Sequence, residues 1–195
     1  MIKGAKRWKK VYHKQTDNAI EEILRKFNQP SLETCGAAAA VNCMDAIGID
    51  LSIETPTGYK IDADEAITLF LNDKRNYDLL YQARNNLDPG ELQNTRVPQH
   101  IPVAVKVLFN CKAEFNWGID IKRYIQELKK GNSIQVCLSI GHYISIIAYD
   151  TCTDEFIYND SWPNRKSLQN KGIRERIKSD FLSSIINPYY IIYKE

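Results

Sequence analysis

The fold of this chain is decided by the stretch QPSLETCG at residues 29–36, which leads directly into the alanine-rich segment GAAAAVNCMDAI at residues 36–47. Alanine is the strongest helix former, and its small side chain allows a neighbouring backbone to approach closely. The proline in the first stretch disfavours helix, so a short loop precedes Cys35. The pattern therefore predicts a buried central helix that starts at Cys35 and ends near Gly48.

Cys35 stands at the first turn of this predicted helix, where unpaired backbone N–H groups and the positive end of the helix dipole favour thiolate over thiol. Two later motifs follow in the order that a thiol site needs, GHY at residues 141–143 and NDSW at residues 159–162. An imidazole beside a thiol can hold it as thiolate and later protonate a leaving amine. We therefore predict that Cys35 is a nucleophile and that His142 is its base.

Asp160 and its neighbour Asn159 are the two candidates for the group that orients His142. A carboxylate or an amide on the second ring nitrogen fixes the tautomer of the imidazole. Successive side chains of a strand point to opposite faces, so the two candidates exclude one another. We predict Asp160, because a charged partner stabilises an imidazolium better than an amide does.

The other two histidines have no comparable surroundings. His13 lies in a basic segment, and His100 is bracketed by Pro98 and Pro102 in an irregular region. A lone histidine in a strand is more often a structural hydrogen-bonding group than a catalyst. The glycine before His142 and the cysteine upstream favour the catalytic interpretation for this one.

Length and charge limit the class of protein. The chain has 195 residues, of which 44% are hydrophobic, so we expect one domain spanning residues 1–195. Its 26 basic and 24 acidic residues give a net charge of +2, so no overall charge argues for a nucleic-acid or membrane partner, and we expect neither. A basic segment at residues 1–16 could bind phosphate, but we expect a solvated, partly frayed arm.

The five cysteines show neither the density of a disulfide framework nor a Cys-x-x-Cys pair. We therefore expect a reducing, cytoplasmic location, with no signal peptide or membrane span and with any export by a non-standard route. Cys43 and Cys137 are expected in the core, whereas Cys111 and Cys152 are candidates for exposed thiols. The acidic clusters lack the spacing of a calcium loop, so we expect no metal, and no cofactor is implied.

The remaining pattern predicts an α+β fold in which helices come first and strands second. Periodicity and capping signals predict a helix over about residues 17–27, capped by Asp17 or Thr16, and a second from 62 to 71 with a capping box between Asp62 and Glu65. Two further helices are predicted, one with Pro102 in its first turn and one over residues 119–130 before Gly131. β-branched and aromatic runs predict an antiparallel sheet from residues 134–140, 143–149, 155–158 and 188–193. The irregular region at about 72–101 is expected to be a variable, cleft-forming segment.

These motifs resemble those of the papain-like cysteine peptidases, and within them the compact bacterial type related to the double-glycine-leader (bacteriocin-processing) peptidases. In that group a glutamine lies six positions before the Cys-Gly pair, as Gln29 does here, and the histidine opens a strand of the form Gly-His-Tyr followed by aliphatic residues. The sequence at residues 160–162 takes the place of the Asn-Ser-Trp-Gly motif of papain, with aspartate as in the bacterial branch. Pro163 departs from the glycine of that motif.

The resemblance implies roles for further residues. Gln29 would help form an oxyanion hole together with the backbone N–H of Cys35. Trp162 would shield the hydrogen bond between His142 and Asp160 from water, and Gly141 and Trp162 would border the bound substrate.

The implied function is that of a cysteine peptidase or amidase, which cleaves a peptide or amide bond through a thioester acyl-enzyme and whose partner is a peptide or protein substrate. An acyltransferase or transglutaminase-like enzyme would use the same Cys-His-Asp triad, because only the second acceptor differs. A catalytically inactive module that keeps the fold for a binding or structural role is the third possibility.

Overall fold

The computed structural model describes residues 1–10, 34–53, 58, 61–83, 97–161 and 172–195 of the chain. The helices in this part are α2 (Cys35–Ile47), α3 (Ala63–Asn72), α4 (Tyr77–Ala83), α5 (Ile101–Phe109), α6 (Ile121–Lys129) and α7 (Ser179–Ile185), with short 3-10 helices η1 (Lys74–Asn76) and η3 (Pro98–His100). The strands are β1 (Ile2–Gly4), β2 (Lys112–Trp117), β3 (Ser133–Leu138), β4 (His142–Asp150), β5 (Glu155–Asn159), β6 (Glu175–Lys178) and β7 (Ile186–Lys194).

The strands form one seven-stranded sheet in the order β2-β7-β3-β4-β5-β6, with β1 paired to β4. The strand pairs are antiparallel. The four predicted strands correspond to β3, β4, β5 and β7, and the α+β class is confirmed. Because β7 lies between β2 and β3, the last strand of the chain is in the interior of the sheet rather than at its edge.

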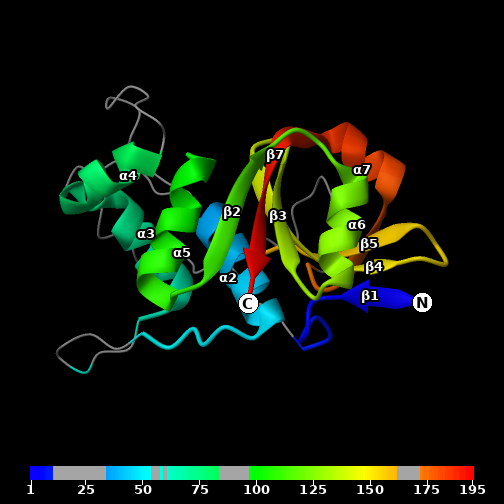
Figure 1. Cartoon of the computed structure of the whole chain (residues 1–195), viewed down its shortest axis with the longest axis horizontal. Coiled ribbons are helices and arrows are strands. Elements are labelled where there is room, and N and C mark those ends of the chain that lie inside the picture. The colour runs from blue at the N-terminus through cyan, green and yellow to red at the C-terminus, as the bar shows by residue number, and fades with distance from the viewer. Residues whose placement is uncertain (11–33, 54–57, 59–60, 84–96, 162–171) are drawn as a thin grey trace.

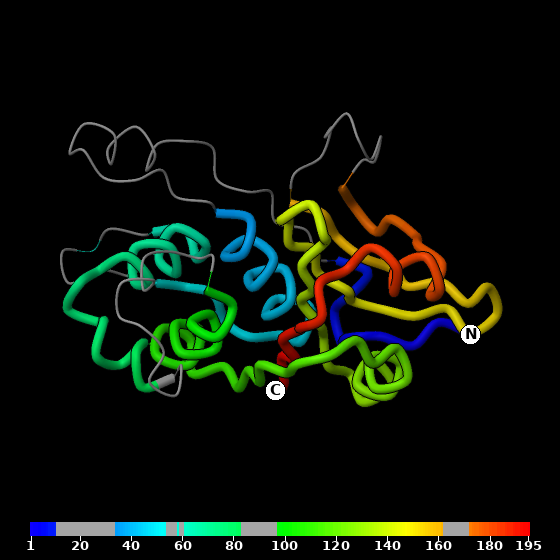
Figure 2. The backbone as a smooth tube through the Cα atoms, turned by 90° about the horizontal axis from the view of Figure 1, so that it is seen from above, coloured from blue at the N-terminus to red at the C-terminus, as the bar shows by residue number. Residues whose placement is uncertain are grey.

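Two hydrophobic cores cover the two faces of this sheet. Helices α2, α3 and α5 pack with one face, and α6 and α7 pack with the other. Figure 1 shows α3, α4 and α5 to the left of β2, and α6 and α7 to the right of β7 and β3. Seen from above in Figure 2, α2 runs between the helices α3 to α5 and the sheet.

Helix α2 is the central element because its small residues let it pack on all sides. Every residue of α2 except Asp45 is buried. The helix ends at Gly48, whose left-handed φ of 95° lets its N–H bond to the carbonyls of Met44 and Asp45. The predicted start at Cys35 and the predicted stop at Gly48 are both confirmed.

The other predicted helices form with small differences. Helix α3 begins after Asp62, but the Asp62 side chain makes no capping hydrogen bond, so the predicted capping box is wrong. Pro102 lies in the first turn of helix α5, which begins at Ile101, as predicted. Helix α6 is capped by the Asp120 carboxylate, which accepts from the N–H of Arg123, and stops before Gly131. The helix predicted over about residues 17–27 lies outside the described residues.

The prediction of a frayed, solvated start is wrong for residues 2–5. Strand β1 pairs with the end of β4, with Ile2 opposite Asp150 and Gly4 opposite Ala148. Ala5 follows with only 1% of its surface exposed. Three residues are too few for a pattern of alternation to stand out among the lysines, so the sequence carried no strand signal. Residues 11–16 of the predicted arm lie outside the described residues.

The segment at about residues 72–101 is more regular than predicted, because η1, α4 and η3 fall within it. Three elements were also missed altogether, namely β2, β6 and α7. Strand β2 has the sequence KAEFNW and β6 has ERIK, and each exposes polar side chains as an outer strand of the sheet. Polar outer strands lack the apolar runs that mark buried ones.

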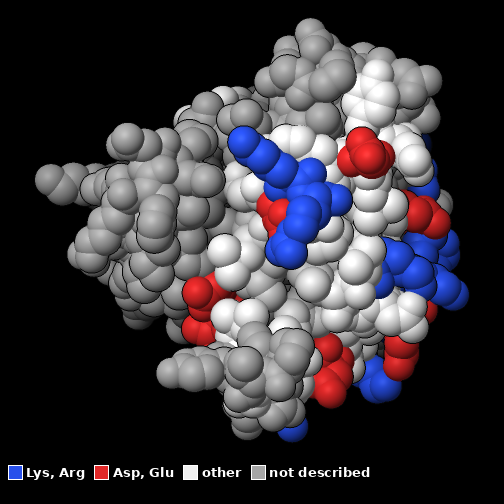
Figure 3. Space-filling view, turned by 90° about the vertical axis from the view of Figure 1, so that its left-hand side faces the viewer, with Lys and Arg blue, Asp and Glu red and all other residues white. Residues whose placement is uncertain are grey.

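Charge is mixed over the described surface. On the face that Figure 3 shows, basic side chains lie among acidic and uncharged ones. No helix in the described part of the chain is long and apolar enough to cross a membrane.

Candidate active site

Cys35 is the first residue of α2 and has 8% of its surface exposed. Among the described residues, the side chain of Thr34 at the N-cap accepts no hydrogen bond from the first turn. The first amide groups of a helix have no intrahelical partner and carry the positive end of the dipole. Cys35 therefore stands in the first turn of the helix, at its N-terminal end.

His142 and Asp160 are brought together at the ends of two adjacent strands. His142 is the first residue of β4, and Asp160 directly follows β5. The Nε2 of His142 lies 2.6 Å from the Oδ1 of Asp160, with 1% and 0% of the side chains exposed. This contact occupies one ring nitrogen, so Nδ1 is the nitrogen that remains for a thiol.

The surroundings of His142 favour its charged form. Burial lowers the pKa of the imidazole. The neighbouring side chains of Asp160 and Cys35 act in the opposite direction, because their polar and negatively charged atoms stabilise the imidazolium. Their effect is the larger one, and the pKa is raised to about 9. An opposite charge and a hydrogen bond that both favour the charged state act in the same direction. The structure therefore brings the three predicted residues Cys35, His142 and Asp160 together, with His142 in direct contact with Asp160.

Asn159, the alternative orienting residue, is engaged elsewhere. Its Nδ2 donates to the Oδ1 of Asn42 on α2 at 3.3 Å, and its Oδ1 accepts from the N–H of Arg174 at 2.9 Å. The amide of Asn42 in turn donates to the carbonyl of Ala38 at 3.0 Å. Asn159 thus links the end of β5 to the nucleophile helix, and it is Asp160 that faces His142.

Gly141 forms the turn that places His142. Its φ is 78°, which L side chains rarely adopt, and its N–H donates to the carbonyl of Leu138 at 2.8 Å. The turn closes the β3–β4 hairpin directly before His142, so a glycine here sets where the histidine begins its strand. Gln29 and Trp162 lie outside the described residues, and their roles stay predictions.

The wall next to Cys35 is built by side chains of the sheet. Cys35 and Ala39 of α2 pack with Cys137 and Tyr143, and Tyr189 lies against them. The hydroxyls of Tyr143 and Tyr189 are 3.3 Å apart. Cys137 is therefore a core thiol, as predicted.

The other cysteines divide between core and surface. Burial raises the pKa of Cys43 to about 12 and that of Cys111 to about 11. The prediction that Cys43 is buried and Cys152 exposed is confirmed, but Cys111 is fully buried, contrary to prediction. It lies between α5 and β2, where its N–H donates to the carbonyl of Val105 at 3.3 Å and its side chain packs in the core.

Sequence reasoning missed a set of buried polar residues under α2. Each donates one hydrogen bond to a backbone carbonyl of the helix: Ser133 to Cys43 at 2.8 Å, Gln135 to Gly36 at 2.9 Å and Ser145 to Ala39 at 2.9 Å. A signal was present, because polar residues alternate with apolar ones in the otherwise apolar strand SIQVCL. That alternation marks the helix-facing side of β3.

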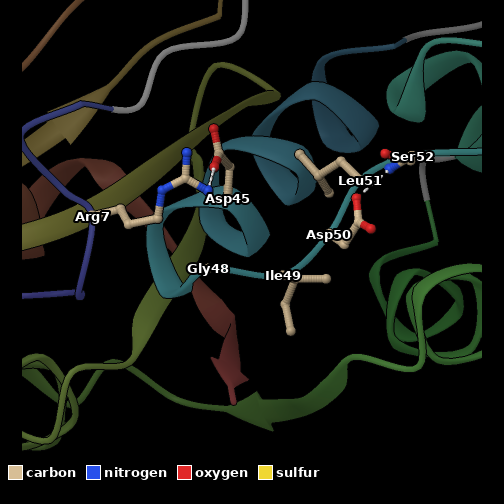
Figure 4. Close-up of a pocket in the computed structure, with 7 residues that line it drawn as sticks. All are labelled: Arg7, Asp45, Gly48, Ile49, Asp50, Leu51 and Ser52. Carbon is tan, nitrogen blue, oxygen red and sulfur yellow. Dashed lines mark hydrogen bonds and ion pairs between the residues drawn. The ribbon is translucent and has the colours of Figure 1, made fainter.

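A separate pocket lies at the other end of α2 and is shown in Figure 4. It is lined by Arg7, Asp45, Gly48, Ile49, Asp50, Leu51 and Ser52. Arg7 and Asp45 form an ion pair, with 2.6 Å between Nη1 and Oδ1. The pocket surrounds the C-terminal end of the helix, so it is no part of the site at Cys35.

In the described ranges, no group of three or more His, Cys, Asp or Glu side chains is arranged so that it could hold a metal ion. The expected absence of a metal and of a cofactor stays a prediction.

Comparison with known proteins finds similar peptidases. The model of the Peptidase C39 like family matches residues 11–190. A double glycine motif protease from an AMS/PCAT transporter, solved in complex with the leader peptide, is similar in structure with a TM-score of 0.53 and 12% identity, covering 100% of this chain and 98% of that chain. This likeness shows the fold, and the predicted papain-like architecture is confirmed.

Two further solved structures are more distant. The N-terminal peptidase C39 like domain of the toxin secretion ATP-binding protein from Vibrio parahaemolyticus has a TM-score of 0.36 and 15% identity, over 66% of this chain and 96% of that chain. UfSP from C. elegans has a TM-score of 0.46 and 10% identity, over 99% of this chain and 34% of that chain. No curated protein matches the sequence.

Proposed function

Because the chain belongs to the Peptidase C39 like family and is a cysteine peptidase, we propose that it cleaves peptide bonds with Cys35 as nucleophile, His142 as general base and acid, and Asp160 as the residue that orients the imidazole. The observation that carries this assignment is the buried contact of 2.6 Å between His142 and Asp160. The proximity of Cys35, which helps to raise the pKa of His142, supports it. A buried imidazolium held between a carboxylate and a thiol has the arrangement that nucleophilic catalysis needs.

The reaction begins when the thiolate of Cys35 attacks the carbonyl carbon of the substrate and forms a C–S bond. The carbonyl oxygen becomes an oxyanion, which the backbone N–H of Cys35 and the side chain of Gln29 would stabilise. The proton on Nδ1 of His142 then passes to the leaving nitrogen as the C–N bond breaks. The amine departs, and a thioester remains on Cys35.

Water completes the cycle. It gives a proton to His142 while its oxygen attacks the thioester carbon, and collapse of the second oxyanion releases the carboxylic acid product and restores the thiolate. Asp160 keeps Nε2 protonated throughout, so Nδ1 is the nitrogen that exchanges protons. Replacement of Gln29 by Ala is expected to lower the rate on the order of 100-fold without abolishing it, because one oxyanion donor remains.

We propose a peptide or protein substrate and one peptidase domain over residues 1–195. The continuous sheet that joins β1 to strands between residues 112 and 194 supports a single unit. The transporter protease named above was solved with a leader peptide, which supports a peptide as the substrate class here. The segment at about residues 72–101 is proposed to border the cleft.

Two experiments test the proposal. Alkylation of Cys35 by iodoacetamide between about pH 5 and 9, followed by peptide mass spectrometry, should be fast at low pH in the wild type and slow in His142→Ala. Exposed Cys152 is the internal reference thiol. Labelling of Cys35 no faster than that of Cys152, and unchanged by the variant, would contradict the assigned pair and favour an inactive module.

A peptide library incubated in ¹⁸O-labelled water separates hydrolysis from acyl transfer. Hydrolysis places ¹⁸O in each new C-terminal carboxylate, whereas transfer to an amine or thiol gives a conjugate without label. Neither product should appear with Cys35→Ser.

A further inference from the structure

Gln135 is a buried polar side chain that contacts the first turn of the nucleophile helix. It lies on β3 with 1% of its surface exposed. Its Nε2 donates to the backbone carbonyl of Gly36, the residue after Cys35, at 2.9 Å. Burial of an amide is unfavourable unless its hydrogen bonds are made, so this side chain depends on its partners.

Tyr193 binds the oxygen atom of the same side-chain amide. The Tyr193 hydroxyl donates to the Oε1 of Gln135 at 2.5 Å, and the tyrosine is fully buried on β7. A backbone carbonyl can only accept, so the NH₂ of Gln135 must face Gly36 and its oxygen must face Tyr193. Tyr193 therefore supports the one orientation in which Gln135 can hold the helix.

The position of this contact along α2 distinguishes it from its neighbours. The bonds from Ser145 and Ser133 reach the helix further along, at Ala39 and Cys43. The bond to Cys43 lies about two helical turns from Cys35. Among these three contacts between helix and sheet, the one from Gln135 is nearest to the nucleophile.

On the alanine-rich surface of α2, such a contact adds a directional restraint. Small apolar side chains pack closely but give little resistance to sliding, whereas a hydrogen bond has a preferred distance and direction. Cys35 is carried by the helix and His142 by the sheet, so any movement between the two layers separates the sulfur from the imidazole. A misplacement of about 1 Å can cost about 100-fold in rate.

We propose that Gln135, oriented by Tyr193, is a positioning residue for the nucleophile. It fixes the first turn of α2 on the sheet and thereby holds the sulfur of Cys35 beside His142. The inference rests on the proposed function of that pair.

The test is the rate of Cys35 alkylation by iodoacetamide at about pH 6, where an ordinary thiol reacts slowly. In the full chain, Gln135→Leu is expected to lower this rate by about 10-fold or more, and Tyr193→Phe by about threefold. Ser133→Ala is the matched control, because it removes a bond from the same strand to the same helix, and its rate should stay within about twofold of the wild type. The pKa of His142, followed by NMR of ¹³C-labelled histidine, should fall in Gln135→Leu and not in Ser133→Ala.

Each outcome decides between the two proposals. A wild-type rate in Gln135→Leu, or an equal loss in Ser133→Ala, overturns the positioning role and leaves the proposed function standing. Slow labelling of Cys35 in the wild type itself, no faster than Cys152, overturns the proposed function and with it this inference. If Gln135→Leu does not fold, Tyr193→Phe decides, since it removes a single hydroxyl; an unchanged rate in that variant overturns the inference.

Discussion

The Nε2 of His142 and the Oδ1 of Asp160 are 2.6 Å apart, and both side chains are buried. They come from β4 and from the end of β5, which are neighbours in the sheet. The carboxylate therefore binds the imidazole from the sheet side, and the opposite ring nitrogen is left for Cys35 of the helix. The three side chains thus come from two layers of the fold, the helix and the sheet.

Asp160→Asn should lower the rate of peptide cleavage by about 100-fold to 10,000-fold, because an amide can favour the wrong tautomer and cannot stabilise the imidazolium by charge. The same variant should slow Cys35 alkylation at about pH 6 to the rate of an ordinary thiol. Cleavage is measured as kcat/KM on a peptide that the wild type cuts, and alkylation by peptide mass spectrometry.

Asn159→Ala is the matched control for this variant, because Asn159 is the adjacent residue and bonds to Asn42 rather than to His142. It should lower stability while keeping activity within about 10-fold of the wild type, as expected for a group outside the triad. Equal losses in Asp160→Asn and Asn159→Ala would show that Asp160 has no special role.

The protonation of His142 should make stability depend on pH. Its folded pKa of about 9 exceeds the ordinary value of 6.5, so the folded state binds this proton more tightly than the unfolded state. The contribution is fully present below about pH 6.5 and is lost as the pH rises through about 9.

Urea unfolding of the wild type and of His142→Gln measures this contribution. As the pH rises through about 9, the wild type should lose more of its unfolding free energy than the variant, which has no titrating group at this position. Parallel pH profiles for the two proteins would contradict a raised pKa at His142.

The parts of the site that could be predicted from sequence are those with local signals. Cys35 begins an alanine-rich helix, and His142 follows a glycine at the start of an aliphatic strand, so neighbouring residues alone indicate both. The choice of Asp160 over Asn159 depended on a charge argument, and the structure has the carboxylate on the imidazole. The contact from Gln135 to Gly36 could not be predicted, since it joins residues far apart in sequence.

For the fold, too, only elements with a local sequence pattern could be predicted. Helix α2 and strand β4 have apolar patterns that follow from their burial on both sides. Strands β2 and β6 lie at the outer ends of the sheet and have half-exposed, charged sequences that resemble loops. Their positions are set by pairing with distant strands, and a single sequence does not encode that pairing in any local pattern.

Gly141→Ala should damage the site through the backbone. The φ of 78° at Gly141 costs an L residue about 1–2 kcal/mol, and relaxation of that strain would move the adjacent His142. We expect lower stability and a lower rate of Cys35 alkylation at about pH 6. Asn tolerates left-handed backbone, so Gly141→Asn should recover part of both losses.

Gly131→Ala is the control for Gly141→Ala. Gly131 has a similar φ of 92°, and at both glycines an added Cβ would meet nothing within 4 Å. The two variants should lose similar stability in urea unfolding, while only Gly141→Ala should lose Cys35 reactivity. Equal reactivity in both would mean that the turn at Gly141 does not place His142.

The start of the chain offers a last test, because β1 was expected to be solvated and is instead part of the sheet. A Cβ on Gly4 would collide with the Cβ of Ala148 and would lie 2.6 Å from the carbonyl oxygen of Ile147. Gly4→Ala should therefore lower the unfolding free energy by about 1–3 kcal/mol, as overpacking does. Lys3→Ala changes an exposed residue of the same strand and should stay within about 0.5 kcal/mol of the wild type. Urea unfolding measures both variants, and an equally small effect of each would mean that β1 is not held against β4.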